Sequence, residues 1–182
     1  MKALILLANG FEESEAIVTA DILMRAGTEV LLVSVEDGPD VLGAHGISVK
    51  ADTMISDVLS LDTDVLVLPG GGAGTETLAM SFQVKGLIEK AVDEGIYVAA
   101  ICAAPSILGR MGLLDGRNIA CYPGFEKYMP AANVTGQKVE TDDIFITAEG
   151  MGVTMQFALK ITELLYGAET AEKIAQEVRS KQ

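Results

Sequence analysis

Short apolar runs recur along the chain, and stretches with helical periodicity separate them. Most of these runs are continuously apolar rather than alternating with polar residues, which is typical of parallel strands buried on both faces. In the first helical stretch, apolar residues recur on one face from Ala16 to Met24, and Gly27 provides a C-terminal stop. Strands that alternate with helices predict an α/β fold, in which a doubly wound, mostly parallel sheet carries helices on both faces.

A length of 182 residues suits a single domain over 1–182. The same alternating pattern gives the expected boundaries of the strands and helices. The expected strands cover residues 2–8, 29–35, 64–70, 96–101, 118–122 and 144–148. The further expected helices cover about 82–94, 104–111 and 153–165, and a last helix starts at about 168. The turn-rich segment 36–62 departs from this alternation, and we expect a short hairpin there.

Acidic residues outnumber basic ones, 26 against 13, so the formal net charge is −13. Because lysine and arginine do not cluster, this charge argues against nucleic acid and against an anionic membrane surface as partners. No apolar run approaches the ~20 residues of a membrane span, and the N-terminus lacks the pattern of a secretion signal. The two cysteines suit reduced thiols rather than a disulfide framework. We predict a cytoplasmic protein whose partner is a small molecule or another protein.

Ligands of open α/β sheets bind beyond the carboxyl ends of the strands, so the loops there are the places to inspect. The loop after the first strand, "NGFEESEA", brings Glu12, Glu13 and Glu15 to a helix start. Acids also occur there simply because they complement the positive end of the helix dipole. In either case three carboxylates would repel a pyrophosphate, which argues against a dinucleotide-binding loop.

The loop after the third strand, "LPGGGAGTETL", contains glycines from Gly70 to Gly72 and again at Gly74. It lacks the lysine of a Walker A loop and the spacing of a dinucleotide-binding loop. Glycine runs let backbone N–H groups converge on one point, as in an anion-binding nest or an oxyanion hole. A tight strand-to-helix turn explains the same glycines equally well.

The loop after the fourth strand, "VAAICAAPSI", places Cys102 where a strand turns into a helix. A nucleophile elbow needs small residues two positions before and after the nucleophile, and these are Ala100 and Ala104. Pro105 suits the first helical turn, and a helix N-terminus favours a thiolate. The alternative is a buried structural thiol, a common fate of free cysteine, and we assign that role to Cys121.

A cysteine nucleophile normally pairs with histidine, yet His45 is the only histidine and lies far upstream of Cys102. This argues against a Cys-His-Glu amidotransferase or a cysteine protease. A glutamate of the first loop is the remaining candidate partner. A buried carboxyl and a thiol that lie close together would share one proton, as thiolate with carboxylic acid or the reverse.

Four stretches resemble a known family in their order and spacing: "LILLANGFEESEA", "DVLVLPGGGAGTETL", "VAAICAAPSIL" and "FITAEGMGVTMQFALKITELL". By these motifs the chain is identified as a member of the ThiJ/PfpI superfamily, in particular of its DJ-one branch. The resemblance implies a flavodoxin-like fold, a homodimer and an oxidation-prone nucleophile at Cys102. It also implies that Glu15 is a protonated carboxyl hydrogen-bonded to the thiol, and that the backbones of Gly71 and Ala103 are oxyanion donors.

The chain departs from the family pattern in ways that bear on its activity. Protease-type members carry histidine directly after the cysteine, where this chain has Ala103, so peptidase activity is not expected. Tyr122 stands where animal members have a histidine, and it could offer a hydroxyl instead. His45 falls where they have an arginine that reaches the pocket across the dimer, although it also suits an ordinary surface loop. Gly70 completes the set of candidate pocket residues.

The resemblance implies a glyoxalase or deglycase that acts on small α-oxoaldehydes such as methylglyoxal, which would become lactate, or on their adducts. Cys102 would attack the aldehyde and Glu15 would move the proton, without glutathione, metal or cofactor. The alternative is an oxidative-stress sensor or redox-regulated chaperone, in which oxidation of Cys102 to the sulfinic acid changes partner binding. The same residues serve both hypotheses, so the sequence leaves both open.

Overall fold

A seven-stranded sheet forms the centre of the computed structural model, which describes residues 1–60 and 62–180. Leu61, in the expected hairpin segment, and residues 181–182 of the predicted single domain lie outside the described residues. The strands are β1 (Lys2–Leu7), β2 (Glu29–Ser34), β5 (Thr53–Met54), β6 (Val65–Leu68), β7 (Tyr97–Ile101), β10 (Val139–Asp142) and β11 (Phe145–Ala148).

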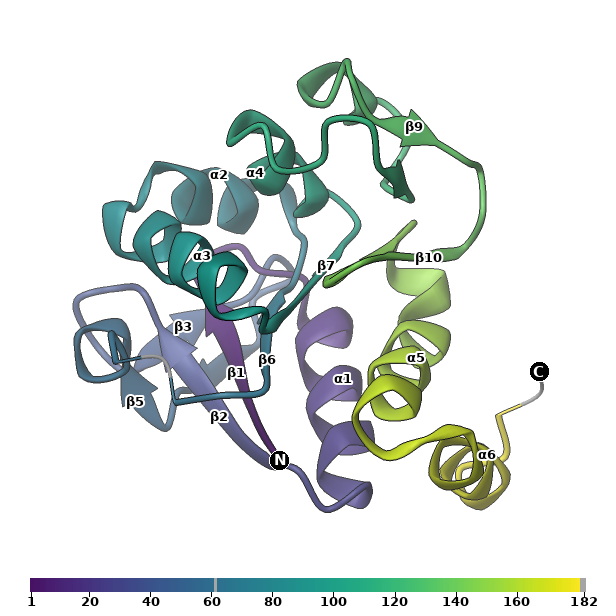
Figure 1. The fold of residues 1–182 in the computed structure, drawn as a ribbon. Helices are drawn as coiled ribbons and strands as arrows, with labels where there is room; N and C mark the ends of the chain where they lie inside the picture. The colour runs from purple at the N-terminus through teal and green to yellow at the C-terminus, as the bar shows by residue number, and fades with distance from the viewer. Residues whose placement is uncertain (61, 181–182) are drawn as a thin grey trace.

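The strand order is β10-β11-β7-β6-β1-β2-β5, and β10 alone runs antiparallel to its neighbour (Figure 1). In sequence order the five main parallel strands follow the 2-1-3-4-5 arrangement of flavodoxin-like folds. The predicted doubly wound α/β fold is therefore confirmed. Because β1, β6, β7 and β11 are parallel, the loops that follow them meet at one edge of the sheet.

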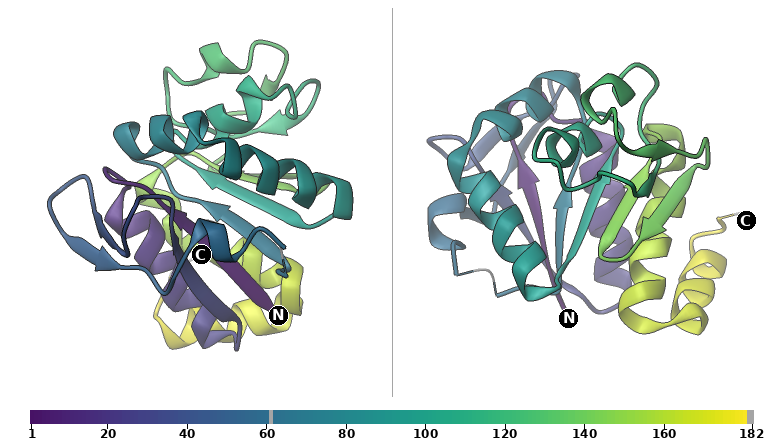
Figure 2. Two further views of the ribbon diagram at one scale, coloured as in Figure 1. Left: turned by 90° about the vertical axis from the view of Figure 1, so that its left-hand side faces the viewer. Right: turned by 45° about the horizontal axis from the view of Figure 1, so that its top comes forward.

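Helices cover both faces of the sheet (Figure 2). They are α1 (Glu13–Arg25), α2 (Gly72–Met80), α3 (Phe82–Glu94), α4 (Pro105–Arg110), α5 (Thr154–Tyr166) and α6 (Ala168–Glu177). Helices α2, α3 and α4 pack on one face, and α1 and α5 pack on the other, with α6 against α5. Two apolar clusters result, one on each side of the sheet.

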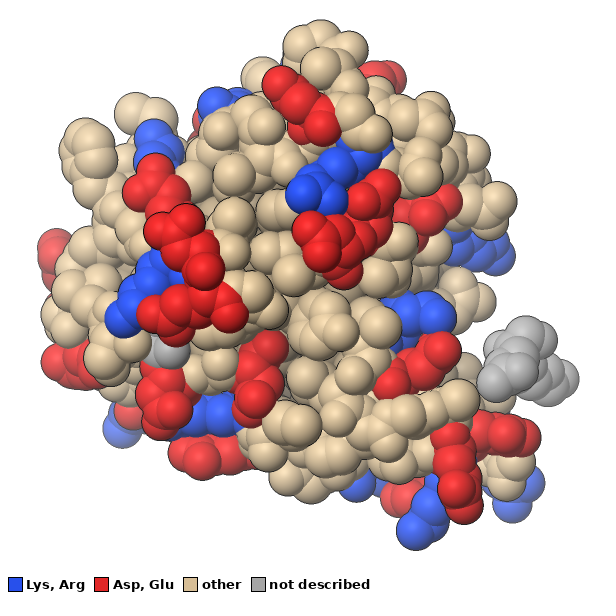
Figure 3. All heavy atoms as spheres, viewed as in Figure 1, with Lys and Arg blue, Asp and Glu red and all other residues tan. Residues whose placement is uncertain are grey.

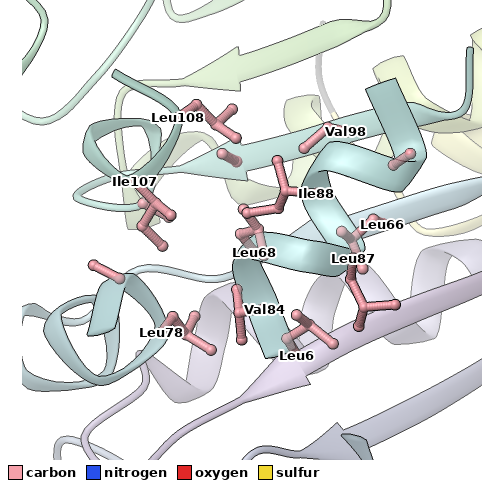
Figure 4. Packing of buried hydrophobic residues seen from close by; sticks show 14 of the residues in the cluster. Leu6, Leu66, Leu68, Leu78, Val84, Leu87, Ile88, Val98, Ile107 and Leu108 are labelled. Atoms are coloured by element: carbon pink, nitrogen blue, oxygen red, sulfur yellow. The ribbon is translucent and has the colours of Figure 1, made fainter. Parts of the chain in front are cut away.

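Alternate side chains of each central strand feed the two clusters, because successive side chains of a strand point to opposite faces. In β1, Leu4 and Leu6 face the α3 side, whereas Ile5 and Leu7 face the α1 side. Figure 4 shows side chains of β6 packed against those of α3. This burial on both faces explains why the strands read as continuous apolar runs.

The helix ends follow the chemistry of their terminal residues. Ser81 caps α3, since its side-chain oxygen accepts a hydrogen bond of 3.3 Å from the Val84 N–H. Gly95 ends the same helix in the left-handed region, at φ 68°. The predicted boundaries 82–94 of this helix are confirmed, and those of α5 and α6 are met to within a residue.

The hairpin expected within 36–62 is present, formed by β3 (Asp40–Leu42) and β4 (Ser48–Lys50). The expected strand 118–122 is wrong in extent and place. Only β8 (Asn118–Ile119) is a strand, and it pairs with β9 (Asn133–Val134) outside the main sheet. The Ala120 N–H instead donates to the Thr147 side chain, which ends the pairing there.

Besides the short strands β5 and β9, the helix α2 and the strand β10 were not expected from the sequence. Helix α2 begins inside the glycine run, where helix propensity is low, so its pattern resembled a loop. Strand β10 lies at the sheet edge with partly exposed, charged residues, and it therefore lacks the apolar signature of the central strands.

Apart from the buried Glu13 and Glu15, the charged residues that the structure describes are at least partly exposed. On the face drawn in Figure 3, Asp and Glu side chains are widely spread and most Lys and Arg side chains lie beside them. Among the described residues, none of the helices combines the length and the apolar character that crossing a membrane requires.

Leu87 tests how much of the stability comes from the cluster under α3. It is 1% exposed there, so Leu87→Ala should lower the free energy of unfolding by about 2–5 kcal/mol through lost burial and a cavity. Leu59→Ala is the matched control because Leu59 is 46% exposed, and its change should stay within about 0.5 kcal/mol. Urea unfolding measures both, and equal losses in the two variants would contradict the assignment.

Candidate active site

Cys102 lies directly after β7 in a backbone conformation that few residues adopt. Its φ is 64°, in the left-handed region that residues other than glycine rarely adopt. Two hydrogen bonds hold it there: the Cys102 N–H donates to the Ala148 carbonyl at 2.9 Å, and the Tyr122 N–H donates to the Cys102 carbonyl at 2.8 Å. This sharp strand-to-helix turn has the geometry of a nucleophile elbow.

Glu15 reaches the same point from the first turn of α1. Its side chain is fully buried, and its Oε2 accepts a hydrogen bond of 2.7 Å from the Gly70 N–H. The carboxyl lies close enough to the Cys102 thiol for each to change the pKa of the other. Its second oxygen, Oε1, has no hydrogen-bond partner among the described residues.

Gly70 makes this meeting of Glu15 and Cys102 sterically feasible. A Cβ atom at position 70 would lie 2.6 Å from the Cys102 Cβ and 2.7 Å from the Glu15 Oε2. Such distances are far below van der Waals contact, and both neighbours are held by backbone hydrogen bonds. Position 70 therefore requires glycine as long as the carboxyl and the thiol stay together.

Burial raises the pKa of Glu15 to about 7, despite the hydrogen bonds from Gly70 and Cys102. Burial likewise raises the pKa of Cys102, which reaches about 12 when the negative charge of Glu15 and its hydrogen bond are added. The two groups thus hold two protons below a pH of about 7 and share one above it. When the carboxyl holds the shared proton its charge is gone, and the sulfur becomes the thiolate.

The backbone N–H groups of Ala103 and Gly71 also affect the Cys102 thiol. Their hydrogen bonds lower the pKa of Cys102 against the larger effect of burial. Gly71 has φ 90°, and a Cβ there would lie 2.3 Å from the Gly10 carbonyl oxygen. The glycine run therefore brings a backbone donor to Cys102, as expected for an oxyanion hole.

Tyr122 lies on the open side of the thiol and is 51% exposed. Its ring is next to Gly150, where an added Cβ would be 3.2 Å from the Tyr122 Cδ2 and 3.8 Å from the Cys102 Sγ. Gly150 follows β11, and the sequence reasoning missed it. The rule that ligands bind beyond the carboxyl ends of strands could have found it, because β11 ends at Ala148.

His45 lies in the hairpin loop, and its contacts are with Glu13 and Glu12. The carboxylate of Glu13 accepts hydrogen bonds from the His45 N–H at 2.7 Å and from its Nδ1 at 2.9 Å. The described hydrogen bonds and ion pairs of His45 do not include Cys102 or Glu15. Within one chain, the imidazole is therefore paired with an acid at the outer end of α1.

Glu13 is a structural residue whose role the sequence reasoning missed. Burial alone would raise its pKa, but hydrogen bonds from His45, from its own backbone and from the Ile47 N–H lower it to about 2. Hydrogen bonding to Glu13 and the charges of Glu12 and Glu13 raise the pKa of His45 in return. A Cβ at Gly43 would collide with the Glu13 side chain, so the hairpin packs directly on this carboxylate.

Glu12, Glu13 and His45 are the metal-ligating side chains that cluster in the described part of the chain, with ligand atoms within 4.8 Å of one another. The oxygens of Glu13 already accept three hydrogen bonds. A metal ion would have to displace the bond from His45 Nδ1, so this set is better suited to holding the hairpin than to holding an ion.

This chain belongs to the class of α/β proteins that carry a cysteine at a strand-to-helix elbow of a flavodoxin-like sheet, with a buried glutamate beside the sulfur. The DJ-1/PfpI family profile matches residues 1–164, and this chain belongs to that family. Protein DJ-1 homolog B of Arabidopsis thaliana is 39% identical over 176 residues, which are 96% of this chain and 40% of that protein. This chain thus spans less than half of that protein, and it spans 45% of homolog A.

Other relatives match along most of their length. The protein named glutathione-independent glyoxalase DJR-1.2 of Caenorhabditis elegans is 34% identical over 174 residues, which are 94% of this chain and 92% of that protein. Among solved structures, a cysteine-to-alanine mutant of a DJ-1 superfamily protein from Salmonella typhimurium has a TM-score of 0.96 at 32% identity, and covers 100% of this chain and 99% of its own. The structure titled oxidized DJ-1 of Toxoplasma gondii has a TM-score of 0.95 at 36% identity, with the same coverage.

The raised pKa of Glu15 makes stability depend on pH. Because the folded-state value is above the ordinary 4.5, folding is most favoured below that pH, and stability is lost as the pH rises to about 7. Glu15→Gln cannot ionise, so near pH ~8 it should regain about 3 kcal/mol relative to its difference from wild type near pH ~4. Denaturant unfolding at both pH values measures this gain, and a difference that does not change with pH would contradict a buried, ionising Glu15.

Proposed function

We propose that this protein is a cysteine-dependent, glutathione-independent glyoxalase or deglycase that acts on small α-oxoaldehydes such as methylglyoxal, or on their adducts. One observation carries the proposal: the sulfur of Cys102 is surrounded by two backbone donors and by a buried carboxyl with a pKa of about 7. Such a carboxyl can both give and take a proton near neutral pH. The reaction needs a nucleophile, a proton carrier and oxyanion donors, and we assign these roles to Cys102, to Glu15 and to the two backbone N–H groups.

In the reaction, Cys102 Sγ attacks the aldehyde carbon and a hemithioacetal forms. The Gly71 and Ala103 N–H groups stabilise the negative charge that develops on the oxygen. Glu15 then removes the proton from the former aldehyde carbon and returns it to the neighbouring carbon. The hydroxyl proton of the hemithioacetal passes to the former ketone oxygen, so the ketone becomes an alcohol and the first carbon a thioester. Water hydrolyses the thioester, which releases lactate and restores the thiol. The sum is methylglyoxal plus water giving lactate and a proton.

The similarity of this chain to members of the DJ-1/PfpI family supports the proposal. A relative that is 34% identical carries the name glutathione-independent glyoxalase, and the proposal extends that activity to this chain. Ala103, where a histidine would be needed beside the cysteine, supports an activity other than peptidase. The free thiols of Cys102 and Cys121 support a reducing compartment such as the cytoplasm.

A second candidate function is a redox sensor or redox-regulated chaperone. It is favoured by the different burial of the two cysteines, because Cys102 is partly exposed whereas Cys121 is 6% exposed. Peroxide would oxidise Cys102 to the sulfinic acid, and a protonated Glu15 could hydrogen-bond one of its oxygens. The oxidised structure of the Toxoplasma gondii relative makes such a state worth testing.

The enzyme proposal predicts that purified protein converts methylglyoxal to lactate without added glutathione or metal. Cys102→Ser and Glu15→Gln should each lower the rate by at least about 100-fold, because one removes the nucleophile and the other the proton carrier. Cys121→Ser, which changes a thiol outside the site, should keep most of the activity.

Lactate release and the mass of Cys102 after peroxide treatment separate the two functions. If the wild type makes no more lactate than Cys102→Ser, while peroxide adds two oxygens to Cys102 alone, the sensor function replaces the enzyme.

We further propose that the protein is a homodimer built on α1 and the hairpin loop. Exposed apolar side chains gather there, with Ile17 at 42%, Ile47 at 59% and Met151 at 58% exposed, around a hollow of about 520 Å³. His45 lines the same hollow, so a partner seated on it would come close to the histidine.

Light scattering at micromolar concentration should give the mass of a dimer for the wild type. Ile17→Lys should shift the protein to a monomer, because it places a charge in a buried apolar contact. Met80→Lys is the matched control, since Met80 is 73% exposed at the end of α2. A monomeric wild type would overturn this interface.

A further inference from the structure

Beside the thiol lies a hollow of about 360 Å³, lined by residues 149–153 together with Tyr122 and Pro123. This volume is in the lower part of the ~300–1,000 Å³ range of small-molecule sites. Gly150 separates the hollow from Cys102, and a Cβ atom there would lie only 3.8 Å from the sulfur. Cys102 is not itself a lining residue, and the glycine at position 150 leaves no side chain between the hollow and the sulfur.

The lining is chiefly apolar, with Pro123, Met151 and Val153 around the half-exposed ring of Tyr122. Glu149 is the one charged side chain in it. The backbone N–H of Glu149 donates to the Lys138 carbonyl, which ties the residue to the neighbouring strand. Its carboxylate has no ion pair or side-chain hydrogen bond in the part of the chain that the structure describes, and Lys138, opposite it directly before the neighbouring strand β10, is the nearest cation along that strand pair.

A second acidic residue, Glu126, lies near Glu149. Glu149 also lines a smaller adjoining hollow, of about 220 Å³, together with Glu126. The buried Glu15 adds a third carboxyl beside the sulfur. A molecule that approaches Cys102 through the hollow therefore meets apolar surface and negative charge.

We infer that this hollow is the entrance to Cys102 and selects electrophiles by charge, with Glu149 as the selecting residue. It admits neutral electrophiles, including α-oxoaldehydes with apolar or aromatic substituents, and it disfavours electrophiles that carry a carboxylate. The inference deepens the proposed function, on which its statement about α-oxoaldehydes rests. Glu149 acts on the approach and binding of the substrate, whereas the bond-making steps belong to Cys102 and Glu15.

A matched pair of alkylating reagents tests the charge selection without any turnover. Iodoacetamide and iodoacetate form the same S–C bond with Cys102 and release iodide, but only iodoacetate is an anion. Glu149→Gln should raise the ratio of the iodoacetate rate to the iodoacetamide rate about fivefold, as expected for removing a like charge a few ångströms away. Added salt should raise this ratio more in the wild type than in Glu149→Gln, because Glu126 and the net negative charge of the chain stay in the variant.

The same comparison is then made on α-oxoaldehydes of equal shape. para-Nitrophenylglyoxal and para-carboxyphenylglyoxal differ in charge, since a nitro group is nearly isosteric with a carboxylate. The ratio of kcat/KM for the carboxylate to kcat/KM for the nitro compound should rise about fivefold in Glu149→Gln. Glu172→Gln, which removes a carboxylate from α6 outside the hollow, should leave both ratios as in the wild type.

The outcomes distinguish this inference from the proposed function. If neither glyoxal is converted but the alkylation ratio rises in Glu149→Gln, the charge selection holds and the enzymatic function fails. If both glyoxals are converted but neither ratio changes by more than about twofold in Glu149→Gln, the enzyme stands and Glu149 is not a selecting residue. A salt effect of equal size in the wild type and Glu149→Gln would also overturn the inference.

Discussion

The hydrogen bond from the Gly70 N–H to the Glu15 carboxyl, 2.7 Å long, is the interaction on which the site depends. It joins the loop after β6 to the first turn of α1, and it fixes the carboxyl beside the thiol of Cys102. The same glycine has no side chain to separate the two groups. Burial raises the pKa of that carboxyl to about 7, so near neutral pH it can take a proton from the thiol or return one.

Glu13 and Glu15 lie two positions apart on α1 and illustrate how environment assigns roles to like residues. Both are buried, but Glu13 accepts hydrogen bonds from backbone N–H groups and from His45, and its pKa falls to about 2. Glu15 has no cationic partner within residues 1–60 and 62–180, and burial raises its pKa to about 7. One carboxylate therefore holds the hairpin against α1, and the other is suited to proton transfer. The family difference at position 45 acts first on Glu13 and not on the thiol.

The sequence predicted the layers of the fold because burial on both faces makes central strands continuously apolar. It also predicted the elbow at Cys102, since small residues at Ala100 and Ala104 are a local steric requirement. It missed α2 and β10, whose identity depends on packing and on the sheet edge rather than on their own composition. The strand expected over 118–122 was wrong for a similar reason, because the Ala120 N–H donates to the Thr147 side chain and not to a neighbouring strand.

Local sequence patterns did not predict that the loop after β11 lies beside the thiol. Gly150 and Glu149 lie in a stretch that resembles the family, but no role was assigned to them from the sequence. Their place beside the thiol follows from the pairing of β11 with β7, which brings Ala148 next to Ile101. That register places the loop over the thiol, so the missing side chain at Gly150 becomes an opening and the carboxylate of Glu149 becomes part of its wall. Reactivity at Cys102 is thus set by residues buried beneath it, while access to Cys102 is set by a neighbouring strand end. The two properties can vary independently, because Glu15 lies on α1 whereas Glu149 and Gly150 follow β11.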